Sequence, residues 1–175
     1  FSVRKINIFE PSITNVSSIK RRIKNIENVT IHKIGLSDKI EETPFYEYAK
    51  RDTHSLYKNT IAGSEVIDEY LVKLSTLDNI LNHNEKFDVL KIDVEGHECK
   101  VLKGSQKILP NVKILEIEIH KNNIYQNCKL PTLEDITSLL PEFFSLLFTQ
   151  TYRKGQADEF NDCLFINSSQ GKFYD

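Results

Sequence analysis

Short apolar runs alternate with longer amphipathic stretches along this chain. The apolar runs predict extended segments, because a buried strand reads as a short and nearly continuous hydrophobic stretch. These segments are Lys5–Glu10, Val29–Leu36, Thr43–Tyr48, Val66–Ser75, Phe87–Asp93, Val112–Ile119, Phe143–Gln150 and Cys163–Asn167. Apolar residues at helical spacing predict helices between them, at Ile13–Ile26, Leu77–Leu81, His97–Leu109 and Leu133–Leu140. This alternation predicts an α/β fold, with a mostly parallel sheet covered by helices and an antiparallel hairpin formed by the last two strands.

The composition is that of an ordinary globular protein. The 175 residues suit one domain, and 39% of them are hydrophobic and 27% charged. A net charge of −2 gives no electrostatic basis for binding nucleic acid. No apolar run approaches the ~18 residues that a membrane-spanning helix requires. The sequence shows no secretory signal peptide, and it opens on Phe1 instead of Met.

The cysteines are odd in number and form no C-x-x-C pair; they are Cys99, Cys128 and Cys163. This pattern argues against a disulfide framework and against a zinc site. Reduced, partly buried thiols are therefore predicted, and they favour a cytoplasmic location.

Acidic side chains follow two of the predicted strands. Ligands of open α/β sheets bind at the carboxyl ends of the strands. Glu10 ends the first strand, where a lone acid can accept both hydroxyls of a nucleoside ribose; a turn residue or a helix cap is the alternative. A later strand runs into the turn Asp93–Glu98 (D-V-E-G-H-E). The dipole of the following helix accounts for Glu95 and Glu98, but less well for Asp93, which still belongs to the strand.

Polar residues also interrupt two apolar strands. Lys91 lies in one strand and Glu116 and Glu118 lie in the next, on one face because side chains alternate. A buried lysine needs a partner, so an ion pair across neighbouring strands is predicted. His120 ends the second strand and could face the same cleft, but no spacing here matches a metal-ligand pattern. The other isolated histidines are expected at the surface or in loops: His32, His54 and His83.

The run Leu90–Glu98 (L-K-I-D-V-E-G-H-E), followed by Val101–Gly104 (V-L-K-G), closely resembles the core motif of FkbM-like methyltransferases. Shorter segments also resemble that family, in the same order along the chain. They are Ile8–Ser12 for its F-E-P segment, Gly35–Asp38 for its A-L-S-D turn, Leu77-Asp78 for its T-L-D and Leu115–Ile117 for its L-E-I strand. The family's opening strand and glycine-rich loop, D-V-G-A-N-x-G, find no match.

The resemblance implies a three-layer, Rossmann-like class I methyltransferase sheet whose first strand is missing from this chain. That strand would be central, between the strand ending at Glu10 and the strand ending at Asp93. Residues 1–175 would then be a single methyltransferase domain that is incomplete at its N-terminus. The absent loop would hold the methionine part of S-adenosylmethionine (SAM). We therefore expect these residues alone to bind SAM poorly and to be inactive.

The same resemblance implies SAM as cofactor, and O-methylation of a hydroxyl on a sugar, a glycan or a natural product. Glu10 would bind the ribose, and Ser37 and Asp38 would lie beside the adenine. The methyl-transfer end would be lined by Asp93, which also contacts the cofactor, and by Glu95 and His97. His97 would be the base because its reference pKa lies near neutrality.

The family does not require a histidine at position 97, and His120 is the next candidate for the base. No metal is implied. Two other classes of function remain open on the residues alone. One is another nucleotide-dependent α/β enzyme, such as a dehydrogenase, and the other is a non-catalytic remnant or interaction module.

Overall fold

The computed structural model describes residues 5–49, 54–60 and 65–171. In chain order the elements are β1 (Ile6–Phe9), α1 (Ile13–Arg22), β2 (Val29–His32), β3 (Gly35–Leu36), β4 (Glu41–Tyr48), β5 (Val66–Ser75), α2 (Leu77–Ile80), β6 (Phe87–Ile92), α3 (Glu98–Lys103), η2 (Leu109–Asn111), β7 (Val112–His120), α4 (Leu133–Leu139), β8 (Phe144–Tyr152), β9 (Phe160–Asn167) and η3 (Ser168–Gln170). Within the described ranges, none of these helices is both long enough and apolar enough to cross a membrane.

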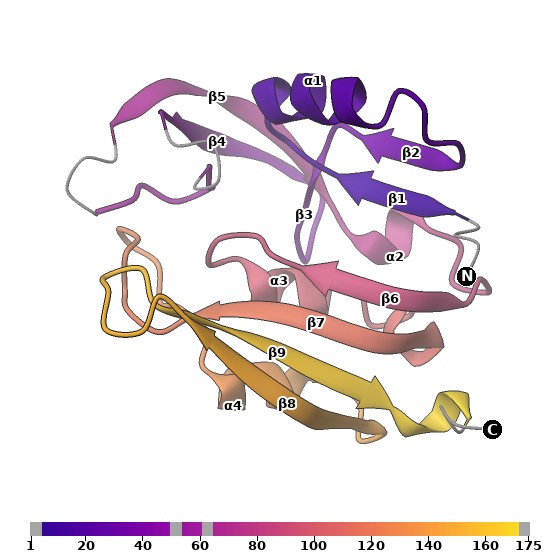
Figure 1. The fold of residues 1–175 in the computed structure, drawn as a ribbon. Helices are drawn as coiled ribbons and strands as arrows, with labels where there is room; N and C mark the ends of the chain where they lie inside the picture. Colours follow the sequence, from indigo (N-terminus) through magenta and orange to yellow (C-terminus); the bar gives the residue numbers. More distant parts are fainter. Residues whose placement is uncertain (1–4, 50–53, 61–64, 172–175) are drawn as a thin grey trace.

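The described strands form three sheets (Figure 1). β1 and β2 pair in parallel, and α1 lies beside them. A second sheet has the order β3-β5-β4, in which β3 is parallel and β4 antiparallel to β5. The third has the order β6-β7-β9-β8, in which only β6 and β7 are parallel.

The predicted mostly parallel, three-layer Rossmann-like sheet is therefore wrong: two of the three described sheets are mixed, and the helices of the described residues are few and short. Parallel neighbours need a crossover, usually a helix, whereas antiparallel neighbours do not. The described part of the connection between β4 and β5 has no helix, and β5 returns antiparallel to β4. β8 and β9 do form the expected antiparallel pair. The predicted missing strand would precede Phe1 and lies outside the described residues.

Local sequence signals place most element ends. Thr132 caps α4, and Asp135 completes a capping box with it. The predicted strand Val29–Leu36 is split, because its last two residues form β3 and pair with β5 instead of continuing beside β1. The predicted helix His97–Leu109 is shorter than expected, since α3 ends at Lys103 and turns lead on to η2.

A buried carboxylate attaches β4 to the start of α1. Ser12 caps α1 by accepting a hydrogen bond from the Asn15 amide, and its hydroxyl donates to Glu47 over 2.6 Å. Thr14 and Tyr70 also donate to Glu47, over 3.1 and 2.6 Å. Although burial alone raises it, these hydrogen bonds from Ser12, Tyr70 and Thr14 hold the pKa of Glu47 below its usual value.

The main core lies on one face of the β6-β7-β9-β8 sheet. Ile92 of β6, Leu115 and Ile117 of β7 and Phe165 of β9 pack there against Leu102 of α3 and residues of α4. Side chains alternate across a sheet, so Lys91, Glu116, Glu118 and His120 project from the opposite face. The sheet therefore has an apolar face under the helices and a second face that is polar toward the ends of β6 and β7.

Candidate functional site

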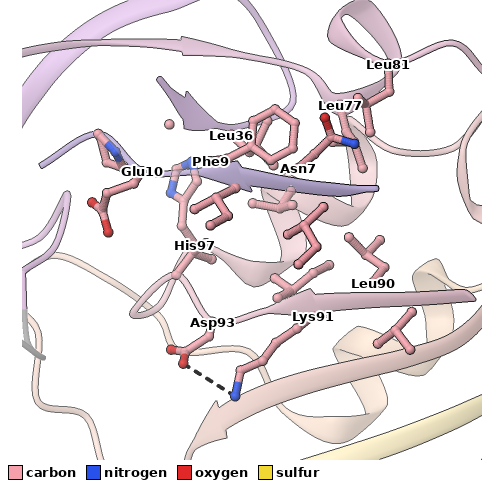
Figure 2. A pocket seen from close by; sticks show the side chains of 18 of the residues that line it. Asn7, Phe9, Glu10, Leu36, Leu77, Leu81, Leu90, Lys91, Asp93 and His97 are labelled. Carbon is pink, nitrogen blue, oxygen red and sulfur yellow. Dashed lines mark ion pairs between the residues drawn. The ribbon is translucent and has the colours of Figure 1, made fainter. Parts of the chain in front are cut away.

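A cleft of about 1590 Å³ lies between β1 and β6. Among the described strands, β1 pairs with β2 and β6 pairs with β7, but β1 does not pair with β6. The walls of the cleft are largely apolar, as Figure 2 shows for Phe9, Leu36, Leu77 and Leu90. Its polar end is formed where β1 and β6 finish, by Glu10, Asp93, Glu95 and His97. A mostly apolar pocket with a few convergent polar groups is typical of a small-molecule site.

Glu10 follows β1 and faces this cleft. Its Oε1 accepts a hydrogen bond from the Ser12 amide over 2.8 Å, and its Oε2 accepts one from Asn15 Nδ2 over 3.3 Å. The carboxylate thus helps to start α1, which was the alternative role considered for it. Each oxygen has a second lone pair, so these contacts leave Glu10 able to accept hydrogen bonds from a ligand. Burial raises the pKa of Glu10.

Ser37 and His97 are brought together behind the cleft. The Ser37 side chain is fully buried, and its Oγ lies 3.0 Å from His97 Nε2 and 3.1 Å from Asp38 Oδ1. Ser37 and Asp38 are not among the described residues that line the cleft, and Asp38 is exposed. Gly104 makes this packing possible, because a Cβ there would collide with the Ser37 carbonyl oxygen.

His97 is already saturated with hydrogen bonds. Its Nδ1 lies 2.8 Å from the Tyr57 hydroxyl, while Nε2 meets Ser37. Its side chain is buried, and burial lowers its pKa to about 4. A neutral imidazole with both nitrogens engaged holds the turn in place, and to act as a base it would first have to release Tyr57.

The turn between β6 and α3 has an unusual backbone. Glu95 and Gly96 both have positive φ values, of 56° and 98°. At Gly96 a Cβ would lie 3.3 Å from the side chains of Cys128, Leu130 and Tyr125, so the site requires glycine twice over. The Gly96 amide donates to Oε1 of Glu98 over 3.0 Å. Glu98 is buried, with its pKa raised by burial to about 7, and is part of the turn's structure.

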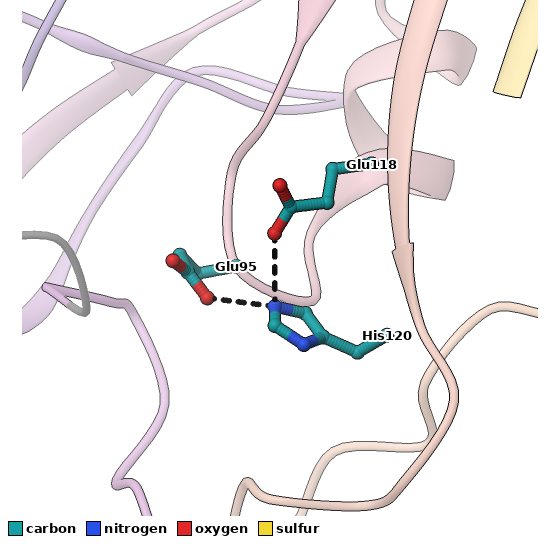
Figure 3. Close-up of side chains that lie close together, drawn as sticks. All are labelled: Glu95, Glu118 and His120. Carbon is teal, nitrogen blue, oxygen red and sulfur yellow. Dashed lines mark hydrogen bonds and ion pairs between the residues drawn. The ribbon is translucent and has the colours of Figure 1, made fainter. Parts of the chain in front are cut away.

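Glu95 points away from the helix amides and toward β7. Its Oε2 lies 2.9 Å from His120 Nε2, and the Tyr125 hydroxyl also donates to Oε2 (Figure 3 shows the contact with His120). Oε1 of Glu118 lies 3.4 Å from the same His120 nitrogen. Burial, with the nearby carboxylates of Asp93 and Glu95, raises the pKa of Glu118 to about 8. Burial disfavours the charged form of His120, but the Glu95 carboxylate outweighs it and raises the pKa of His120.

Asp93 is more accessible, since 39% of its side chain is exposed. Partial burial and the neighbouring Glu95 carboxylate raise the pKa of Asp93. Lys91 Nζ lies 3.8 Å from Asp93 and 3.1 Å from Glu116. The predicted ion pair across neighbouring strands is thus confirmed. It is not buried, however, because about half of the Lys91 side chain is exposed.

Several residues of the site escaped the sequence analysis. Tyr57 and Tyr125 lie in loops without motifs, and Glu118 was considered only as an ion-pair partner. His54 was expected at the surface or in a loop; it lies in a loop but is buried, and its Nδ1 accepts a hydrogen bond from the Tyr48 amide over 3.0 Å. The sequence did contain one signal for this part of the site. Glu118 and His120 are two residues apart at the end of a strand, a spacing that places both side chains on the same face of the sheet.

Comparisons with known proteins agree with this geometry. A family model described as the methyltransferase FkbM domain matches residues 4–154. The hexuronic acid methyltransferase AglP of Haloferax volcanii is 33% identical over 88 residues, which cover 50% of this chain and 28% of that protein. The crystal structure of methyltransferase FkbM from Methylobacillus flagellatus KT is similar in fold, with a TM-score of 0.55 at 18% identity, over 93% of this chain and 36% of that chain.

The chain therefore spans only about a third of the length of these two relatives. The family model, in contrast, covers most of the chain, including both the F-E-P segment and the D-V-E-G-H-E turn. The fold likeness extends over nearly all of it. This chain belongs to the FkbM methyltransferase domain family.

Proposed function

We propose that this chain contributes the cofactor cleft and part of the acceptor site of a SAM-dependent O-methyltransferase. The observation that carries the proposal is the convergence of Glu10, Asp93 and Glu95 on one cleft at the ends of β1 and β6. Membership of a methyltransferase family favours methyl transfer over the dehydrogenase and the non-catalytic alternatives. The named activity of AglP supports a sugar acid as the acceptor, whose hydroxyls and carboxylate are both oxygen nucleophiles.

The residues of the cleft fit such a cofactor. The predicted first strand of the sheet would lie between β1 and β6, so the polar end of the cleft, at Glu10, Asp93 and Glu95, is the part that we assign to the cofactor. There Glu10 offers carboxylate oxygens for two ribose hydroxyls. Ser37 and Asp38 would act at the adenine end. Ser37 is buried and does not line the cleft, so it would act indirectly, by holding His97 and Asp38 in place. SAM, when bound, supplies an activated methyl group on its sulfonium.

Asp93 is the group that we assign to the proton of the acceptor hydroxyl. It is accessible from the cleft, and its raised pKa brings it closer to the range in which a carboxylate works as a general base. Glu95 would shape the acceptor side, with its carboxylate held by His120 and Tyr125. His97 remains a prediction for the base, and it would act only after exchanging Tyr57 for the acceptor.

Replacing Glu10 tests the cofactor assignment. In the full-length protein, Glu10→Gln should weaken SAM binding by about 1.5–3 kcal/mol, the range for a hydrogen bond to a charged group. Glutamine can still accept from the Ser12 amide, so α1 should persist. Isothermal titration calorimetry measures the change, with the exposed Glu27→Gln as control. Equal SAM affinity for both folded variants would remove Glu10 from the cofactor site.

A further inference from the structure

Three side chains beside the polar end of the cleft, of which Glu95 also lines it, bring ligand atoms to one point. We call Glu95, Glu118 and His120 the Glu-Glu-His cluster (Figure 3). One carboxylate oxygen of each glutamate and one ring nitrogen of His120 all lie within 4.8 Å of one another. The two shorter separations, from His120 Nε2, are 2.9 and 3.4 Å. Ligand atoms that share one metal ion at about 2.0–2.2 Å are separated by similar distances.

His120 gives an independent indication that something belongs at this point. Its side chain is only 7% exposed, and it aims Nε2 between the two carboxylates. Within the described residues its other nitrogen, Nδ1, is buried and has no hydrogen-bond partner. The contacts at Nε2 are therefore the polar contacts that hold the ring. That nitrogen carries at most one proton, yet two carboxylates converge on it.

The charges around the cluster are unbalanced. Asp93 adds a third carboxylate at the end of β6, and the cationic group beside it, Lys91, is paired with Asp93 and Glu116. In the described part of the chain, Glu95 and Glu118 therefore share one imidazole, whose single positive charge when protonated balances only one of the two carboxylates, and the neutral Tyr125 hydroxyl. Paired carboxylates kept out of water need a counter-charge, which a divalent cation supplies.

We propose that Glu95, Glu118 and His120 form a divalent-cation site at the carboxyl ends of β6 and β7. Two carboxylate oxygens and one imidazole nitrogen suit Mn²⁺ and similar ions of intermediate hardness. Three protein ligands leave coordination positions open for water or for an oxygen of another molecule. Glu118 and His120 come from β7 and Glu95 comes from the turn after β6, so two of the three ligands are held by a regular strand.

The use of this cation rests on the proposed function, whereas the site itself does not. An ion bound here lies next to Asp93, at the methyl-transfer end of the cleft. It would hold an acceptor hydroxyl through an open position and lower the pKa of that hydroxyl. It would also allow an acidic region to accept an anionic sugar, which the carboxylates alone would repel.

A manganese titration tests the site without any turnover. Metal-free full-length protein is titrated with Mn²⁺, and free Mn²⁺ is followed by electron paramagnetic resonance. We expect saturable binding of one ion per chain. Glu118→Gln keeps the shape of the side chain and should weaken binding by at least about tenfold, as should Glu95→Gln, because each removes an anionic ligand. Glu116→Gln is the matched control on the same strand and face, and should bind as the wild type does.

Circular dichroism of each variant excludes unfolding as the cause of a loss. No saturable binding by the wild type would overturn the proposal, and so would equal binding by the wild type and Glu118→Gln. A parallel SAM titration separates this idea from the proposed function. If the protein binds SAM but not Mn²⁺, the cation site is contradicted and the cofactor cleft stands. If it binds Mn²⁺ but not SAM, the cofactor cleft is contradicted and the cation site stands.

Discussion

Single carboxylates do different work in this chain, and their hydrogen bonds distinguish them. Glu47 is buried and accepts three hydrogen bonds from hydroxyl groups, so it stabilises the attachment of β4 to α1. Asp93 is partly exposed, lines the cleft and forms a long ion pair with Lys91. Glu95 and Glu118 share one histidine. A saturated acid indicates structure, and an accessible acid at a strand end indicates chemistry.

Glu47→Gln should destabilise the protein by about 1–3 kcal/mol near neutral pH, because the buried hydroxyls lose a charged acceptor. The folded-state pKa of Glu47 lies below the usual value for a glutamate, so its contribution to stability is present above the unfolded-state pKa and is lost as the pH falls through the folded-state pKa. Urea denaturation measures the free energy of unfolding of the wild type and of Glu47→Gln. The difference between the two proteins should be smaller near pH 3.5 than near pH 7. The exposed Glu42→Gln is the control, and a difference that grows in acid would contradict this assignment.

Asp93→Asn should lower kcat by about 10²–10⁴-fold if this carboxylate accepts the proton of the acceptor. SAM affinity should change little, because asparagine keeps the size and polarity of the site. Steady-state kinetics on a sugar acceptor, together with a SAM titration, separate the two effects. Asp88→Asn, an exposed acid on the same strand, should behave as the wild type. Near-normal turnover would move the base to His97 or His120.

The sequence predicted the residues at strand ends better than the residues that meet them. Glu10 and Asp93 could be placed in the cleft because an acid after an apolar strand has a predictable location. Tyr57, Tyr125 and the role of Glu118 could not be placed. Their contacts with His97 and Glu95 cross between distant segments, and no local pattern encodes such contacts.

At the scale of elements, the existence and type of most strands followed from hydrophobic pattern, but their partners did not. β4 and β5 were both expected as extended segments, and the antiparallel pairing between them was not. Pairing depends on the length and structure of the connections, which periodicity does not report. The pairing of β6 with β7 was an exception and could be predicted, because the alternation of charged residues in these two successive strands indicated a shared face.

Lys91→Met should change the free energy of unfolding by no more than about 1 kcal/mol, the usual worth of an exposed ion pair. The structure requires this small value because 49% of the Lys91 side chain and 32% of the Glu116 side chain are exposed. Lys113→Met removes a second exposed pair between the same strands, with Asp88, and should have a similar effect. A loss of about 3–5 kcal/mol on denaturation would mean that the Lys91 pair is buried in solution.

At the scale of the molecule, the cleft lies between separate sheets, so ligand binding should bridge the ends of β1 and β6, which do not pair with each other in the described part of the chain. SAM should slow hydrogen exchange in the segments after β1 and after β6, around Glu10 and Asp93–His97. The hairpin of β8 and β9 is remote from the cleft and should be unaffected. Mass spectrometry of the full-length protein with and without SAM measures this. Uniform protection, or protection confined to the hairpin, would place the cofactor elsewhere.

The register of β7 has a consequence for changes in chain length. Lys91 lies opposite Glu116, and Glu118 and His120 follow on the same face by steps of two. One residue inserted between Val112 and Glu116 would turn both Glu118 and His120 toward α3 and α4, and would expose Ile117 and Ile119. Two inserted residues would restore the faces. Length variation at this point of β7 is therefore tolerable only in even steps, whatever residues are inserted.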